Sequence, residues 1–148
     1  MTNNLYELLK KLKNTKHATD AGRRIHSGMR HIIIDNDKTC GNPEIIAQIK
    51  SHPNLLEFFS ANSMTEVPVA GFINDTIVSR RIDRMIINND NKTIKILDYK
   101  TDTDKNIFLS KYIAQIQEYK ILVQDIFPGY TVYGYILWLN DFSLTEIK

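Results

Sequence analysis

Residues 93 to 101 read Thr-Ile-Lys-Ile-Leu-Asp-Tyr-Lys-Thr, and this stretch decides how the rest of the chain is interpreted. Its β-branched and aromatic residues predict a strand. Because side chains alternate across a strand, we expect Asp98 and Lys100 on one face and Leu97 and Tyr99 on the other. The stretch therefore predicts a carboxylate and an ammonium side by side at the end of an apolar strand.

Asp98 and Lys100 form a pair suited to phosphodiester hydrolysis. A carboxylate can hold Mg²⁺, which activates water and acts as a Lewis acid. An ammonium two residues along can orient that water and bind a phosphate oxygen. A tripeptide this short is common by chance, so a surface ion pair worth less than about 1 kcal/mol stays open as the simpler interpretation.

A second acidic residue, Asp83, interrupts the β-branched segment at residues 79–86. The polar cluster at residues 88–92 predicts a turn between this segment and the strand at 93–101, which places Asp83 nearly opposite Asp98. Facing carboxylates repel each other unless a cation neutralises them, and this favours a metal site. The alternative is a bulge or register shift that turns one of them to solvent.

The remaining periodicity predicts helices at the front of the chain, strands in the middle, and then one long helix and one strand. Residues 66–100 are rich in Val, Ile and Thr, and the last strand is apolar on both faces, so it should be internal. Residues 35–42 are typical of a loop. The expected elements are a helical extension over 1–19, a second helix from Asp20 through Ile32, short helices over 43–50 and 53–60, three antiparallel strands within 66–100, a helix over 106–125 and a strand over 132–139. We expect one domain over residues 1–148, of α/β class, with a mixed sheet.

Composition narrows the classes of protein. Of the 148 residues, 43% are hydrophobic and 24% charged, which excludes disordered and collagen-like chains. A lone cysteine, Cys40, excludes an intrachain disulfide and a four-cysteine zinc or iron–sulfur site, and it favours the reducing cytoplasm. The net charge is +2, but residues 1–31 carry seven Lys or Arg against two acids. This basic segment permits contact with nucleic acid, although solvated surface lysines explain it equally well.

Missing motifs exclude further classes. The sequence contains no phosphate-binding loop of the G-x-x-x-x-G-K-[ST] type, no G-x-G-x-x-G and no G-x-S-x-G. We therefore expect no ATP-driven activity, no dinucleotide cofactor and no serine nucleophile. The N-terminal residues lack the apolar run of a secretory signal, and no window is apolar enough to span a membrane, so we expect a protein without membrane contact.

Two further groups of residues are candidates for a site. His26 lies on the second expected helix, where a lone histidine is most often a surface residue with one hydrogen bond. Gln115 and Tyr119 share one face of the long helix, with Lys111 one turn earlier. Such a stripe can be the edge of a core, but an amide, a phenol and an ammonium also suit a phosphate backbone or an ordered water.

Taken together and in order, these motifs resemble the RecB-type nuclease domain of the PD-(D/E)XK superfamily. The resemblance is strongest to the nuclease domain at the carboxyl end of the AddA and RecB helicase–nucleases, and it covers residues 20 to 139. The motifs that carry it are Gly22-x-x-Ile25-His26, Glu66-Val67-Pro68, Ile82-Asp83-Arg84, Asp98-Tyr99-Lys100-Thr101 and Tyr112-x-x-Gln115-x-x-x-Tyr119. It implies a three-layer, restriction-endonuclease-like core, with a mixed central sheet flanked by helices.

The resemblance also implies roles for single residues. A divalent metal, usually Mg²⁺ and alternatively Mn²⁺, would be bound by the His26 imidazole, the Asp83 and Asp98 carboxylates and the Tyr99 main-chain carbonyl. Lys100 would be the catalytic lysine. Gln115 and Tyr119 would line the site and the DNA path, Arg84 would meet a phosphate, and Glu66 would brace the strand or a neighbouring basic residue. Lys111, which lies on the same helical stripe as Gln115 and Tyr119, is expected to contact DNA as well.

The expected activity is thus metal-dependent hydrolysis of DNA without ATP, in end processing or double-strand break repair, with single-stranded ends as the first substrate and a helicase as a possible partner. Two departures from the family matter. Arg80-Arg81 stands where related sequences usually have a small residue, and the helicase that normally accompanies such a domain is missing from the 148 residues. Two alternatives remain open: a non-catalytic DNA-binding or helicase-docking module, and a junction-resolving or restriction-type endonuclease on the same core.

Overall fold

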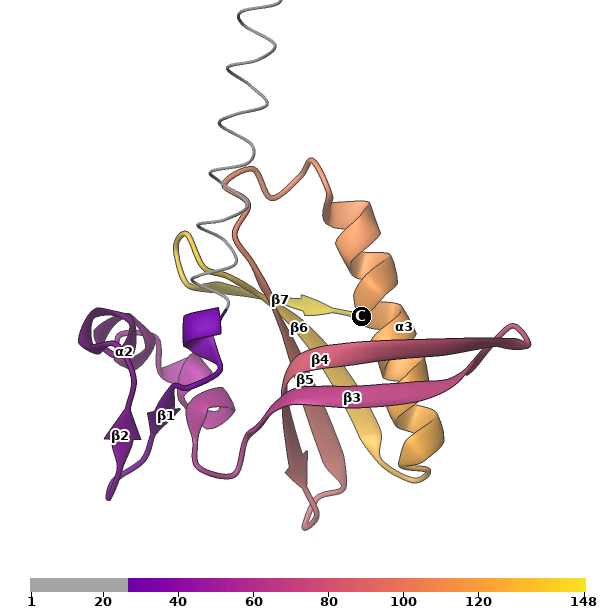
Figure 1. Cartoon of the computed structure of the whole chain (residues 1–148), viewed down its shortest axis with the longest axis horizontal. Coiled ribbons are helices and arrows are strands. Elements are labelled where there is room, and N and C mark those ends of the chain that lie inside the picture. Colours follow the sequence, from indigo (N-terminus) through magenta and orange to yellow (C-terminus); the bar gives the residue numbers. More distant parts are fainter. Residues whose placement is uncertain (1–26) are drawn as a thin grey trace, which may run out of the picture.

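The structure is a computed structural model that describes residues 27–148 (Figure 1). The described elements are β1 (Ile33–Ile34), β2 (Thr39–Cys40), α2 (Pro43–Lys50), the 3-10 helix η1 (Pro53–Phe59), β3 (Met64–Ile73), β4 (Thr76–Asn88), β5 (Thr93–Lys100), α3 (Leu109–Ile126), β6 (Thr131–Trp138) and β7 (Ser143–Ile147). The expected helical extension over 1–19 and the start of the second helix lie outside the described residues.

The main sheet has five strands in the order β3-β4-β5-β6-β7. β5 and β6 are parallel and joined through α3, whereas the other neighbours are antiparallel. A parallel connection needs a crossover, and the long helix predicted between these strands provides it. The expected α/β class and mixed sheet are therefore confirmed, and β6 is internal as its two apolar faces predicted.

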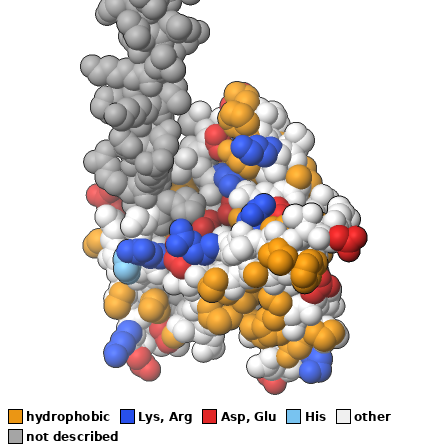
Figure 2. Space-filling model, turned by 45° about the vertical axis from the view of Figure 1, so that its right-hand side comes forward, with side chains coloured by type: hydrophobic (Ala, Val, Ile, Leu, Met, Phe, Trp, Pro, Cys, Tyr) orange, Lys and Arg blue, Asp and Glu red, His pale blue; other side chains and the backbone are white. Residues whose placement is uncertain are grey.

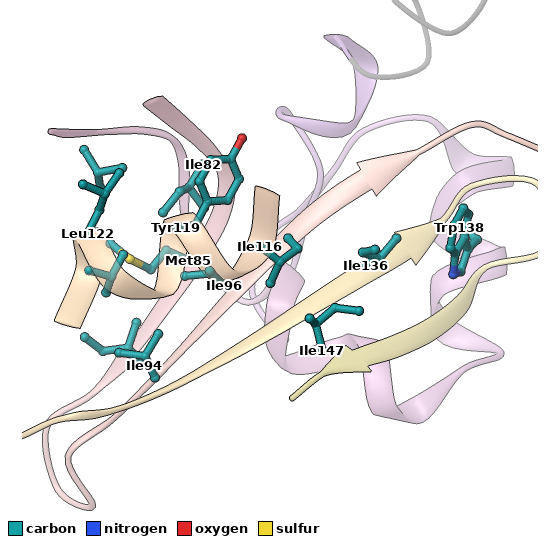
Figure 3. Packing of buried hydrophobic residues seen from close by; sticks show 13 residues of the cluster. Ile82, Met85, Ile94, Ile96, Ile116, Tyr119, Leu122, Ile136, Trp138 and Ile147 are labelled. Carbon is teal, nitrogen blue, oxygen red and sulfur yellow. The ribbon is translucent and has the colours of Figure 1, made fainter. Parts of the chain in front are cut away.

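Helices cover both faces of the sheet. On one face, α3 packs on a buried apolar cluster from β4, β5 and β6, shown in Figure 3, which includes Ile96, Ile116 and Ile136. On the other face, residues from α2 and η1 pack against Leu97, Tyr99 and neighbouring strand residues. The alternation predicted for residues 93–101 produces this division, because Ile96 faces α3 and Leu97 faces the other layer. The three-layer core is therefore confirmed.

Gly134 allows α3 to approach the sheet closely. A Cβ atom at this position of β6 would lie 2.3 Å from Cγ2 of Ile116, a separation that real Cβ atoms do not reach. Only glycine fits between β6 and the helix without a shift of one of them. This close contact sets how near the first half of α3 lies to the middle of β6, where Gly134 pairs with Ile96 of β5.

Several local predictions need correction. The helix predicted over 53–60 is a 3-10 helix, and the segment predicted as a loop contains the short antiparallel pair β1–β2. The second predicted helix ends earlier than expected, since a turn follows Met29 and β1 follows Ile32. β7 was not predicted at all. In contrast, α2 begins as expected, because Asn42 accepts hydrogen bonds from the N–H groups of Glu44 and Ile45.

β3 and β4 extend beyond the sheet as a two-stranded arm (Figure 1). A two-residue turn joins them, in which Asn74 and Asp75 both have positive φ, as a type I′ hairpin requires. Pairing between β4 and β5 ends at Arg84 and Leu97, and the residues of β4 before Arg84 pair with β3 alone. The sheet therefore splits between β4 and β5. Among the described residues, no helix is both long and apolar enough to cross a membrane.

Candidate functional site

Two buried carboxyl groups lie where β4 and β5 separate. Arg84 and Leu97 form the last pair between these strands, and the next residues along them are Asp83 and Asp98. These two residues are only 7% and 4% exposed. The structure therefore brings together the two acids that the turn at residues 88–92 predicted to be opposite. Since the strands stop pairing here, the carboxyl groups occupy the base of the split.

The Asp83 carboxyl is held against β5 by the main chain. Oδ2 of Asp83 accepts a hydrogen bond from the N–H of Tyr99, with 2.8 Å between the two atoms. Burial is the main reason that the pKa of Asp83 rises from 3.8 to about 8, and the charge of Asp98 is the second. The N–H of Tyr99 and the ammonium of Lys100 oppose this rise. At neutral pH and without a bound cation, Asp83 therefore holds a proton.

One oxygen of Asp98 has no hydrogen bond from the part of the chain that the structure describes. Oδ2 of Asp98 is buried, and no donor among residues 27–148 makes a well-directed hydrogen bond to it. Nζ of Lys100 lies 2.7 Å from this oxygen and forms an ion pair with it. A buried carboxylate oxygen without a hydrogen bond is unusual, and a bound cation would satisfy it.

The Lys100 ammonium is fixed by groups from α3. Nζ donates a hydrogen bond to Oε1 of Gln115 over 2.9 Å, and it lies 4.3 Å from the ring centre of Tyr112. With the Asp98 oxygen, these contacts hold the ammonium between β5 and the helix. Lys100 is therefore preorganised beside the carboxyl pair, with 16% of its side chain exposed.

Gln115 and Tyr119 continue this network along α3. Nε2 of Gln115 donates a hydrogen bond to the Tyr119 hydroxyl over 2.7 Å, which fixes the orientation of the amide and turns its oxygen toward Lys100. Burial raises the pKa of Tyr119 to about 12, and the charge of Asp98 contributes. Tyr119 therefore stays neutral and can donate its own proton to a further acceptor.

Tyr112 has a role that sequence reasoning did not assign. Its hydroxyl donates to Oδ2 of Asp102 over 2.6 Å, and burial, together with this hydrogen bond, raises its pKa. Its ring lies against the Lys100 ammonium. The available signal was the spacing of Tyr112, three residues before Gln115 on the same helical face.

The expected metal ligands fall partly outside the described residues. His26 is not among them, so its predicted place beside the acids remains a prediction. Within residues 27–148, no group of three or more His, Cys, Asp or Glu side chains could hold a metal ion. Asp83 and Asp98 fit as two oxygen donors, because they are adjacent, buried and mutually repulsive, and because one Asp98 oxygen lacks a hydrogen bond.

The prediction that Arg84 contacts DNA is wrong. Arg84 is fully buried and points away from the acid pair, into the layer of α2 and η1. Its guanidinium makes five hydrogen bonds, to the main-chain oxygens of Met29, Ile32 and Phe58 and to the hydroxyls of Ser63 and Tyr99. These bonds use its donors, so none is left for a phosphate. Arg84 instead joins the segment at 29–32 and η1 to the sheet.

The other predicted residues lie at the edge of the site. Glu66 forms an ion pair with Arg81, with 2.8 Å between Oε2 and Nε, as its expected bracing role requires. It has a φ of 53°, so β3 is locally distorted there, opposite the stretch of β4 that carries Asp83. Lys111 is exposed on the first turn of α3. The Tyr99 side chain is buried on the opposite face from Asp98, and its hydroxyl accepts from Arg84.

Comparison with known proteins supports the fold. No protein-family model and no curated protein matches the chain. Among solved structures, it is similar to the "Putative exonuclease" of Eubacterium rectale, with a TM-score of 0.52 and 17% identity over 95% of this chain and 58% of that one. A second structure, of a protein designated SSO0001, matches with a TM-score of 0.43 and 20% identity over 72% of this chain and 52% of that one.

The described chain therefore spans 58% of the length of the first solved relative. At 17% identity that match establishes the fold. The mixed five-stranded sheet, covered by α3 on one face and by α2 and η1 on the other, is the α/β arrangement of a restriction-endonuclease-like core.

Proposed function

We propose that this chain is a divalent-metal-dependent nuclease that hydrolyses DNA without ATP. The observation that carries the proposal is the pair of buried carboxyl groups, Asp83 and Asp98, with the Lys100 ammonium 2.7 Å from Asp98 at the point where the sheet splits. A fold needs no such group for stability, because adjacent buried carboxylates repel each other. The structural similarity to the "Putative exonuclease" supports a nuclease function.

Asp83 and Asp98 would hold the metal ion, with the Tyr99 carbonyl and His26 as the further proposed ligands. Carboxylate oxygens favour Mg²⁺, and an imidazole among the ligands would make Mn²⁺ acceptable. When bound, the ion would supply Lewis acidity and make a nucleophilic water available at neutral pH. Its positive charge would also offset the repulsion between the two carboxyl groups, and Asp83 would lose its proton when the ion binds.

The remaining chemistry belongs to side chains of the chain itself. Lys100 is held between Asp98 and Gln115, so its ammonium can meet a phosphate oxygen on which negative charge develops. Gln115 fixes that ammonium, and its amide is in turn fixed by Tyr119. Tyr119 keeps its proton at working pH because its pKa is about 12, so it can serve as a neutral hydrogen-bond donor.

The alternative of a non-catalytic binding module is disfavoured by the same residues. A module that only binds DNA or docks on a helicase gains nothing from two facing buried carboxyl groups, of which Asp83 has a raised pKa. A role in DNA end processing, a preference for single-stranded ends and a helicase partner remain parts of the proposal that activity assays must decide.

The direct test is cleavage of labelled single-stranded, duplex and circular DNA in Mg²⁺, in Mn²⁺ and in EDTA. We expect cleavage in either metal and none in EDTA. Asp83→Asn and Asp98→Asn should each lower the rate by at least about 100-fold, because each removes a charged metal ligand. Cleavage of circular DNA would indicate the endonuclease alternative.

Asp90→Asn is the matched control, because Asp90 lies in the exposed turn at the other end of the same hairpin. It makes the same chemical change without touching the carboxyl pair, and its rate should equal that of the wild type. Activity that persists in EDTA, or in the Asp98→Asn variant, would refute the proposal.

A further inference from the structure

Two large apolar side chains are exposed beside the candidate site, at the start of α3. Ile107 is 65% exposed and Phe108 is 46% exposed, and they are adjacent in sequence. Scattered exposed hydrophobic residues are ordinary, but two together beside a polar site are not. Figure 2 shows a face of the molecule on which basic and acidic side chains lie between groups of exposed hydrophobic side chains.

Phe108 is also a poor residue for its position in the helix. It occupies the cap position of α3, where Ser, Thr, Asp or Asn would accept hydrogen bonds from the first free N–H groups, and it makes no such bond. The position therefore lowers helix stability and exposes an aromatic ring at the same time. A residue that violates two local rules together indicates a functional demand.

The Phe108 ring is connected to the candidate site through one other ring. Its centroid lies 6.1 Å from that of Tyr112, and the Tyr112 ring lies 4.3 Å from Nζ of Lys100. The N–H of Tyr112 donates to the main-chain oxygen of Phe108 over 3.0 Å, so the first helical turn fixes the two residues relative to each other. The exposed ring is thus one aromatic neighbour away from the ammonium that would meet the phosphate.

Charged groups of both signs lie near this ring: Asp102 and Asp104 precede Phe108 in the chain, and one exposed cation, Lys111, follows it. Lys111 is exposed on the same helical turn as Phe108 and Tyr112. The nearby acid Asp102 accepts the Tyr112 hydroxyl. An aromatic face with an ammonium one turn away is the combination that binds single-stranded nucleic acid, because a base stacks on the ring and the cation meets the phosphate. A base inside a duplex has both faces covered by its neighbours and cannot stack in this way.

We propose that Ile107 and Phe108 form a stacking platform for an unpaired nucleobase next to the bond that is cut, so that the substrate at this site is a single strand. The inference rests on the proposed nuclease function for its account of the neighbouring phosphate. The base would stack on Phe108, and Lys111 would contact the backbone. Phe108 would act as a positioning residue, since it touches neither the carboxyl pair nor the reacting phosphate.

The test compares two strands of equal length in EDTA, an oligodeoxythymidine and a strand made only of abasic sites, with affinity measured by fluorescence anisotropy. Phe108→Ala should weaken binding of the oligodeoxythymidine about tenfold and leave binding of the abasic strand unchanged, because only the stacking contact is lost. Phe108→Trp should restore the affinity. Lys111→Gln should weaken both strands equally, since it removes a phosphate contact.

Phe72→Ala is the matched control. Phe72 is 64% exposed near the end of the β3–β4 arm, paired with Ile77, which is six residues along β4 from Asp83 or roughly 20 Å. Its loss should change neither affinity. An equal loss from Phe72→Ala would show a general apolar surface and overturn the platform.

Other outcomes would overturn the platform in different ways. The platform would be overturned if Phe108→Ala bound the oligodeoxythymidine as tightly as the wild type does, or if it lost affinity equally for both strands. It would also be overturned if the wild-type protein bound both strands equally. A variant that changed only the oligomeric state, measured by sedimentation, would assign the surface to a second copy of the chain instead.

Failure of the platform and failure of the nuclease proposal give separate signals. With Mn²⁺, Phe108→Ala should raise the KM for single-stranded DNA and leave kcat nearly unchanged, because the residue acts in binding. A wild type that binds through Phe108 and cuts nothing would refute the nuclease and leave the platform. If the wild type cuts DNA and its KM equals that of Phe108→Ala, the platform would be refuted and the nuclease proposal would stand.

Discussion

Oδ2 of Asp83 accepts the main-chain N–H of Tyr99 over 2.8 Å, which ties an acid on β4 to β5 just where the two strands cease to pair. This bond replaces the ladder hydrogen bonds that end there. It also keeps the Asp83 carboxyl beside Asp98 although both are buried. Burial, and after it the repulsion from Asp98, raises the pKa of Asp83.

The first prediction concerns stability against pH in EDTA. Asp83 has a pKa of 3.8 when unfolded and about 8 when folded, so the folded state binds more protons between these values. The free energy of unfolding should therefore fall as pH rises from about 4 to about 8, by at most about 1.4 kcal/mol per pH unit from this group. Urea denaturation of the wild type and of Asp83→Asn gives the difference. A difference that does not change over this range would contradict the raised pKa.

The second prediction concerns protons released on metal binding. A metal ion needs the ionised form of Asp83, so below pH 8 each ion bound should release up to about one proton, and release should vanish above that pH. Calorimetric titration with Mn²⁺ in buffers of different ionisation enthalpy measures this number. Asp83→Asn should bind Mn²⁺ more weakly and without proton release. Release that persists in Asp83→Asn would assign the proton to another group.

The third prediction separates Lys100 from the metal ligands. Lys100→Ala removes the ammonium that pairs with Asp98, so cleavage should fall at least about 100-fold while Mn²⁺ still binds. The change leaves a buried carboxylate without its cation and should destabilise the metal-free fold by roughly 1 to 3 kcal/mol. Lys95→Ala, on the opposite face of the same strand, is the control and should cleave normally. Loss of Mn²⁺ binding in Lys100→Ala would place Lys100 in the metal site itself.

The fourth prediction concerns Arg84. Arg84→Lys leaves buried main-chain oxygens of Met29, Ile32 and Phe58 without some of their donors, so the free energy of unfolding should drop by roughly 3 kcal/mol or more. Arg81→Lys, at a side chain that is 71% exposed, should change it by less than about 0.5 kcal/mol. Thermal and urea unfolding measure both. Equal effects would show that the hydrogen bonds of Arg84 contribute little.

Strong local patterns predicted much of the fold. The β-branched runs and the turn at residues 88–92 placed β4 and β5 in antiparallel register, and the long amphipathic segment became α3. β7 was missed because its residues carry only a short and mixed pattern, and it forms by pairing with β6. The β1–β2 pair was missed for the same reason, since two residues per strand leave no periodicity to detect.

Arg84 shows the limit of reasoning from residue type. The prediction that Arg84 meets a phosphate came from its place beside a candidate metal ligand, but side chains alternate along a strand, so Arg84 lies on the opposite face of β4 from Asp83 and pairs with Leu97. Only the tertiary structure shows that Arg84 points into the layer of η1, where main-chain oxygens from two distant segments meet its guanidinium. The role of Tyr112 was missed because its contact with Lys100 joins α3 to β5, and a contact between two elements cannot be predicted from the pattern of either one.

The sequence by itself determined the identity and spacing of the acids, the lysine and the helical stripe, because strand and helix periods are local properties of the chain. Only the tertiary structure decided that β4 and β5 separate after Arg84 and Leu97, that the acids are buried in that split, and that α3 holds Lys100 over them. Burial and convergence depend on how layers pack against each other, and no residue pattern within one element carries that information.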